Sequence, residues 1–169
     1  IEELYKSYDA LVGRVVKKLE KGDVLVVCSD HGFTSFRRGI HLISWLRANG
    51  YLKLKEGAEG TSEWLREVDW SQTKAYALGL TGMFLNLKGR ESEGIVEPGE
   101  EAEALKEELI GKISGLVDEE KGEVGIVEVF DTHKLYHGPY LGNAPDFLIG
   151  YHNGYRTSRE CSTGVEAVP

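Results

Sequence analysis

The sequence predicts an α/β protein in which helices pack against a mixed sheet. Apolar residues recur at helical spacing over residues 2–20, between charged residues. Residues 24–28 follow as an uninterrupted apolar run rich in valine, which is typical of a strand buried on both faces. A helix that leads directly into such a strand is characteristic of the α/β class, so we expect a parallel core around residues 24–28.

The first predicted helix carries its apolar residues on one face. Gly22 in the "EKGD" segment is a natural stop for this helix. The apolar face is formed by Leu4, Tyr8, Leu11, Val12, Val15, Val16 and Leu19.

The middle of the chain predicts shorter elements. Residues 40–49 favour a short helix that ends at Gly50, and residues 51–55 alternate as a strand with one solvated face. Residues 74–89 favour two short strands joined around residues 79–82, which suggests a hairpin. This part of the sheet is therefore expected to be more antiparallel.

The C-terminal half predicts one long helix and two strands. Residues 97–116 have a proline near the start, acidic residues in the first turns and apolar residues on one face. Residues 125–136 and 144–151 each contain a strand, with Pro145 suited to an edge. Beyond Tyr155 no clear period is present. Without a linker or a repeat, residues 1–169 are predicted to form a single domain.

Charge and composition limit the classes of partner. The 169 residues carry a net charge of −8, and 41% of them are hydrophobic. Residues 91–123 hold twelve acidic and three basic residues, so the negative charge is concentrated there. This argues against a surface that coats nucleic acid, because phosphates need a basic face, but it leaves room for a small anionic substrate in a local pocket. No apolar run approaches the ~20 residues that a membrane helix needs.

The two cysteines and three tryptophans are interpreted as structural residues. Cys28 and Cys161 are too few for a disulfide framework, and Cys28 is expected to be a small core residue. This usage suits a reducing cytoplasm, which is the predicted location. Trp45, Trp64 and Trp70 are most simply core or cover residues, and stacking of one of them on a nucleotide base is left open.

A carboxylate and an imidazole stand side by side where the predicted strand of residues 24–28 ends. Asp30 and His31 are followed by Gly32, and a turn there could aim both side chains at one point. Ligands in α/β sheets bind beyond the carboxyl ends of strands, and oxygen and imidazole nitrogen are ligands that zinc prefers. The alternative is a capping Asp30 beside a surface histidine, and two ligands alone do not complete a site.

The turn and three later stretches together resemble the type I phosphodiesterase / nucleotide pyrophosphatase branch of the alkaline phosphatase superfamily. The resemblance covers nearly the whole chain in order. It is carried by the stretches "VLVVCSDHGF", "HLISWLRANGYLKL", "VDWSQTKAYALGLTGMFLNLKGRESEGIVEPGEE" and "YHGPYLGNAPDFLIGYHNGYRTS".

This resemblance implies a hydrolase with two divalent ions in a three-layer α/β/α sandwich. The ions are commonly zinc, with manganese or magnesium as alternatives. A Ser or Thr nucleophile attacks phosphorus, and water then hydrolyses the covalent intermediate. Asp30 and His31 match the adjacent pair that holds the metal activating the nucleophile. The implied substrate is a small phosphate ester or a nucleotide.

The remaining parts of the implied active site do not match this sequence. In the family, the nucleophile and the other metal's Asp and His precede the matched turn, and a further metal-binding His follows the "APDFLIGY" region. The resemblance therefore implies a C-terminal portion of a larger enzyme, with no catalytic nucleophile of its own and a sheet incomplete at both ends. We expect the isolated chain to be inactive, to bind metal weakly at best or to be metal-free, and to form homo-oligomers through an exposed sheet edge.

Three residues after the turn are candidates for contact with the substrate. Arg37 and Arg38 are placed to bind an anion, and His41 begins a predicted helix near the same loop. The alternatives are a solvated arginine pair and a histidine on a helix face.

Two other functions stay open from the sequence. A phosphomutase or sulfatase of the same superfamily would share the Asp-His pair. A truncated, non-catalytic domain that acts by folding or association is the alternative from a different class.

Overall fold

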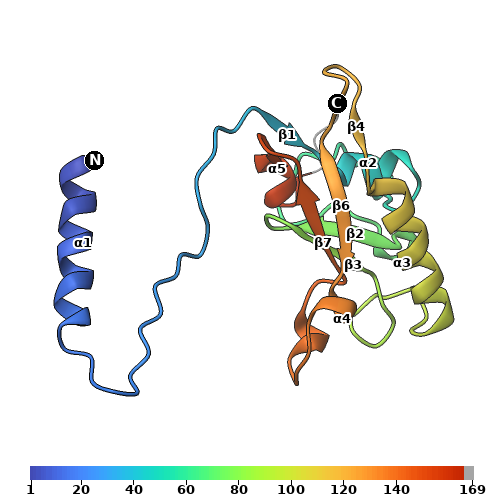
Figure 1. The fold of residues 1–169 in the computed structure, drawn as a ribbon. Coiled ribbons are helices and arrows are strands. Elements are labelled where there is room, and N and C mark those ends of the chain that lie inside the picture. The colour runs from blue at the N-terminus through green and yellow to red at the C-terminus, as the bar shows by residue number, and fades with distance from the viewer. Residues whose placement is uncertain (166–169) are drawn as a thin grey trace. The chain divides into compact units, whose positions relative to one another are not determined.

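The computed structural model describes residues 1–165 and divides into two compact units, Ile1–Phe33 and Thr34–Pro169. Figure 1 shows the elements of each unit, which are treated separately below. The prediction of a single domain over residues 1–169 stays a prediction.

The first unit contains the predicted N-terminal helix. Helix α1 spans Glu2–Val16, which confirms the amphipathic helix predicted from residues 2–20. Lys6 pairs with Glu2 at 2.7 Å and with Glu3 at 3.2 Å on its polar side. None of the residues of α1 is buried, so within the first unit no other segment covers its apolar face.

The buried strand predicted at residues 24–28 is absent from this structure. The segment forms no strand, and Val24, Val26 and Val27 are 83%, 74% and 73% exposed. A strand needs a neighbour to accept and donate its backbone hydrogen bonds, and no segment among the described residues pairs with it. The predicted parallel core is therefore wrong for this chain, and Cys28 is exposed rather than a core residue.

The second unit is organised around an antiparallel sheet. Its four strands run in the order β2-β3-β7-β6, and every neighbouring pair is antiparallel. These strands are β2 (Ala75–Leu78), β3 (Gly82–Leu85), β7 (Phe147–Tyr151) and β6 (Ile126–Asp131). The predicted hairpin and both C-terminal strands are confirmed.

The remaining strands of the described residues form two small sheets of two strands each. Strands β1 and β8 pair in parallel, with Gly39 opposite Arg156. Strands β4 and β5 form a short antiparallel pair. Their bounds are β1 (Arg38–Ile40), β8 (Tyr155–Thr157), β4 (Val117–Asp118) and β5 (Glu123–Val124).

Helices cover the sheet of the second unit. Helix α3 contacts β6, while α2 and α5 contact β2, and Figure 1 shows α3 running alongside the strands. The predicted helices at residues 40–49 and 97–116 are confirmed as α2 and α3. The helical elements are α2 (Leu42–Ala48), α3 (Glu100–Ile113), α4 (Thr132–Leu135), α5 (Arg159–Ser162) and the short 3-10 turns η1 (Trp70–Gln72) and η2 (Leu141–Asn143).

Three local predictions differ from the structure. The strand expected at residues 51–55 is reduced to an isolated bridge between Leu54 and Val68. Strand β1 falls in a predicted loop, and β8 and α5 fall in the tail that showed no period. The short parallel pair β1 and β8 depends on residues more than a hundred positions apart, so local pattern could not reveal it.

The core of the second unit lies between the main sheet and its helices. Fully buried members include Leu42, Leu46, Met83, Leu109 and Phe147. Trp45 and Trp70 are half-buried and pack against this core, as expected. Trp64 is 59% exposed, so it is not a core residue.

The chain is thus a mixed α/β protein with several sheets. Within the described residues, no helix combines the length and the apolar character needed to cross a membrane.

Candidate functional site

The Asp30–His31 pair forms the candidate metal site of the first unit. Nε2 of His31 lies 3.4 Å from Oδ2 of Asp30, and the two side chains are 65% and 86% exposed. The Nδ1–H of His31 donates to the carbonyl of Gly32 at 2.9 Å, and the ring meets Phe33 edge-on at 5.5 Å. These contacts hold the imidazole so that Nε2 faces the carboxylate.

This geometry suits a divalent ion. Because Nδ1 carries the proton that Gly32 accepts, Nε2 of the neutral ring presents its lone pair beside the carboxylate. Two ligands bound to zinc at 2.0–2.2 Å with tetrahedral angles are separated by about 3.4 Å. The observed 3.4 Å between Nε2 and Oδ2 therefore fits two ligands of one ion. The same distance also suits an ion pair when the imidazole is protonated.

The pair supplies only part of a metal site. A zinc site uses three or four protein ligands. Among the described residues, no group of three or more His, Cys, Asp or Glu side chains is arranged to hold an ion. Asp30 and His31 thus fit a metal by donor type and spacing, but they do not complete its coordination.

The two candidate arginines lie in the second unit and have different environments. The backbone N–H of Arg37 donates to the carbonyl of Gly154 at 2.8 Å, and its side chain is exposed. Arg38 begins β1, and its guanidinium binds Asp118 at 2.8 Å and Glu120 at 2.8 Å. Arg38 therefore has carboxylate partners, whereas Arg37 remains the freer cation. Their role in substrate binding stays a prediction.

His41 is the N-cap of α2, as the predicted helix start implied. Its Nδ1 accepts a hydrogen bond from the backbone N–H of Ser44 at 3.2 Å. Burial lowers the pKa of His41, and the His41 carbonyl, the charge of Glu160 and the Val165 carbonyl oppose this only in part. The imidazole is accordingly neutral near pH 7 and acts here as a helix cap. A contact with substrate stays a prediction.

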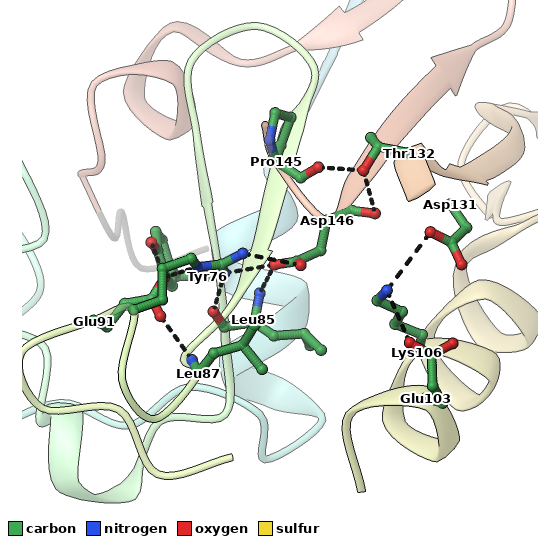
Figure 2. A network of polar contacts seen from close by, with 11 residues as sticks. Tyr76, Leu85, Leu87, Glu91, Glu103, Lys106, Asp131, Thr132, Pro145 and Asp146 are labelled. Atoms are coloured by element: carbon green, nitrogen blue, oxygen red, sulfur yellow. Dashed lines mark hydrogen bonds and ion pairs between the residues drawn. The ribbon is translucent and has the colours of Figure 1, made fainter. Parts of the chain in front are cut away.

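Sequence reasoning missed a buried ion pair in the second unit. Asp146 is 1% exposed and receives two hydrogen bonds from Arg90, at 2.7 and 3.1 Å. The backbone N–H of Leu85 donates to the same carboxylate at 2.7 Å, as Figure 2 shows. The partner of Asp146 lies 56 positions away in the sequence, so no spacing rule connects Arg90 with Asp146.

A neighbouring carboxylate extends this network. Glu91 accepts from Arg90 at 2.8 Å and from the backbone N–H of Leu87 at 2.8 Å. The hydroxyl of Tyr76 donates to Glu91 at 3.2 Å, and burial together with that carboxylate raises the pKa of Tyr76. Tyr76 is therefore a neutral hydrogen-bond donor at any ordinary pH.

The structure first defines the class: a mixed α/β protein with several sheets, in which an aspartate and a histidine lie side by side after an apolar segment. Comparison with protein families then identifies the family. The model of the type I phosphodiesterase / nucleotide pyrophosphatase family matches residues 1–166. The chain belongs to this family. A search of curated proteins gave no match, and neither did a search of solved structures.

Proposed function

We propose that this chain is the C-terminal part of a metal-dependent phosphoric-ester hydrolase of the phosphodiesterase / nucleotide pyrophosphatase type. Family membership supports the phosphoric-ester hydrolase class. The observation that carries the proposal is the 3.4 Å separation of His31 Nε2 and Asp30 Oδ2, which suits two ligands of one ion. In the whole enzyme the fold is a three-layer α/β/α sandwich.

In this proposal Asp30 and His31 hold one of two divalent ions, zinc in the first instance. When bound, such ions lower the pKa of a hydroxyl nucleophile and stabilise charge on the phosphate oxygens. Asp30 supplies a negative oxygen, and His31 supplies a neutral nitrogen oriented through its bond to the Gly32 carbonyl. The Ser or Thr nucleophile lies outside this chain, and the substrate is a small phosphate ester or a nucleotide.

The exposed apolar segment at residues 24–28 supports the larger enzyme. We infer that it adds a strand to the sheet of that enzyme, which would bury its valines and place Asp30 and His31 at the strand's carboxyl end. The same exposed segment also favours the second candidate, a non-catalytic domain that associates with another copy of itself.

Hydrolysis of bis(4-nitrophenyl) phosphate tests the location of the nucleophile. The 169-residue chain, supplied with zinc, is expected to show no turnover above a metal-only blank. Robust turnover that depends on Asp30 would place the nucleophile within the chain and contradict the proposal.

Zinc titration followed by histidine ring NMR signals tests the ligand pair. We expect weak binding that shifts the signals of His31, because two ligands hold an ion less firmly than four. Asp30→Ala and His31→Ala should abolish the shift. His133→Ala removes another exposed histidine and serves as the matched control. Equal binding by all variants would refute the assignment.

A further inference from the structure

A cavity in the second unit has no role in the proposed hydrolase site. It has a volume of about 340 Å³, is open to solvent and lies beside the Arg90–Asp146 network. Its walls include three aromatic side chains, Trp64, Trp70 and Tyr76, together with Asn86, Glu91 and Glu93.

The aromatic walls offer ring faces and edges in a fixed arrangement. Trp70 meets Tyr76 edge-on at 5.1 Å, and Tyr76 stacks on Phe84 at 5.1 Å. Trp64 is 59% exposed although it lines the cavity, so part of its indole remains free to contact a ligand. Aromatic faces of this kind attract cations through their ring quadrupole.

The backbone that carries Trp64 is held in an unusual conformation. Trp64 and Leu65 have φ values of 65° and 54°, a left-handed region that side chains other than glycine seldom occupy. Two backbone hydrogen bonds hold it, from Trp64 to the Thr163 carbonyl at 2.8 Å and from Leu65 to the Gly164 carbonyl at 3.0 Å. Consecutive strained residues persist where the surrounding structure fixes them, often at ligand sites.

The charged groups that line the cavity are all acidic. Glu91 and Glu93 contribute carboxylates, and no lysine or arginine is among the lining residues. Arg90 contacts both Glu91 and Asp146, so its one positive charge offsets only one of these two carboxylates. Glu93 is exposed, and within residues 1–165 no side-chain partner is found for its carboxylate. The wall of the cavity and its surroundings thus carry an excess of negative charge.

Asn86 adds an unpaired acceptor. It is fully buried, and its Nδ2 group donates to the carbonyls of Trp70, Thr73 and Glu93 at 2.9, 2.9 and 3.1 Å. These donations fix the amide orientation. Its Oδ1 is also buried and accepts no hydrogen bond from any described residue. Because this oxygen is buried, it acts on a bound ligand through its partial negative charge, which favours a nearby cation over an anion.

We propose that this cavity binds a small organic cation that carries a planar guanidinium group. A guanidinium plane stacks on indole and phenol rings, and its N–H groups donate to carboxylates. The uncompensated Glu93 carboxylate and the aromatic walls select a positive, flat group. The same acidity disfavours a nucleotide, whose phosphate would approach Glu93.

Indole N–H signals in two-dimensional ¹H–¹⁵N NMR spectra test the site, with butylguanidinium as the probe and the 169-residue chain as the sample. We expect saturable shifts of the Trp64 and Trp70 signals. Trp45, which stacks on Tyr51 at 6.0 Å and does not line the cavity, is the internal control. Shifts confined to Trp45, or shifts that never saturate, would overturn the proposal.

Two further probes separate charge from shape. Butylurea has a similar planar group without the charge and is expected to bind at least tenfold more weakly than butylguanidinium. Adenosine monophosphate is expected to leave both cavity signals unchanged. Equal binding of butylurea, or saturable shifts with the nucleotide, would show that the cavity does not select a cation.

Matched variants locate the interaction. Glu93→Gln is expected to weaken butylguanidinium binding about threefold, in line with one exposed ion pair. Trp64→Leu keeps apolar bulk but removes the indole face and should weaken binding about fivefold. Glu107→Gln alters an exposed glutamate on α3 outside the cavity and should bind as the parent does. Since Glu93 and Trp64 are exposed, both variants should fold, which urea unfolding checks. Unchanged affinity in both would overturn the proposal.

Discussion

Helices with a similar pattern of apolar residues differ in burial between the two units of this protein. In the second unit, α3 buries Leu105, Leu109 and Ile113 against the sheet. In the first unit, α1 carries an equally periodic apolar face, yet Leu4, Leu11 and Val15 are 54%, 46% and 39% exposed. Periodicity therefore states which face of a helix needs a partner. It does not state which segment supplies that partner.

The aspartates that have a cationic or imidazole partner also differ in burial between the two units. Asp146 is 1% exposed and is held by Arg90 and by the backbone of Leu85. Asp30 keeps 86% of its side chain exposed beside His31. A buried carboxylate must be fully paired where it stands, whereas an exposed one retains oxygen lone pairs for an incoming ligand. The first arrangement is structural, and the second is suited to binding.

Leucine truncation in the two helices gives the largest expected contrast. Leu109→Ala removes a fully buried side chain and should lower the free energy of unfolding by about 3–4 kcal/mol. Leu11→Ala, at an exposed position of α1, should change it by less than about 0.5 kcal/mol. Urea unfolding measures both. A large loss in Leu11→Ala would mean that the face of α1 is packed in solution.

Removal of the Asp146 carboxylate should be nearly as costly. Asp146→Ala leaves the Leu85 N–H and the Arg90 guanidinium without their partner, so we expect a loss of about 3 kcal/mol. The partial exposure of Arg90 keeps the loss near the lower end of the range for buried pairs. Asp9→Asn, at an exposed aspartate of α1, is the control and should be neutral. A neutral Asp146→Ala would show that the pair contributes little.

Local pattern predicted the elements whose partners are near in sequence. The hairpin at residues 74–89 became β2 and β3, with Tyr76 opposite Phe84 across a tight turn. The helix at residues 97–116 became α3, because acidic first turns and one apolar face are local signals. By contrast, residues 24–28 have the composition of a buried strand, but a strand also needs a neighbour.

The polar residues discussed above also differ in whether the sequence predicts them. Asp30 and His31 were found because they are adjacent and follow an apolar run. The network of Arg90, Asp146 and Tyr76 was not found, because its members come from separate strands and loops. Nothing in the residue types alone shows that Asp146 is buried. The antiparallel pairing of β3 with β7 brings these groups together.

A charge in the exposed apolar segment tests whether the first unit drives association. The parent chain is expected to self-associate, and Val26→Lys should shift it toward the monomer while changing stability by less than about 0.5 kcal/mol. Val117→Lys, at a valine of β4 that is 49% exposed, is the matched control. Sedimentation velocity measures the mass. A monomeric parent, or equal effects of both variants, would argue against an interface at residues 24–28.

The smallest expected effect is a change in the pKa of Asp118, the carboxylate partner of Arg38. Burial alone would raise the pKa of Asp118, but the hydrogen bond from Arg38, with a smaller one from Tyr155, lowers it overall. A carboxyl pKa that is lower in the folded state stabilises the protein above the unfolded value of about 4. This stabilisation disappears as the pH falls through the folded pKa. Arg38→Met should therefore raise the pKa of Asp118, measured by carboxyl ¹³C NMR.

Arg47→Met, at an exposed arginine of α2, provides the control and should leave that pKa unchanged. Inorganic phosphate gives the complementary measurement. Because Arg38 is engaged by Asp118 and Glu120, phosphate should not displace these carboxylates or move the Asp118 titration. If phosphate does move it, Arg38 exchanges its carboxylates for an anion, and its predicted contact with substrate gains direct support over the structural role.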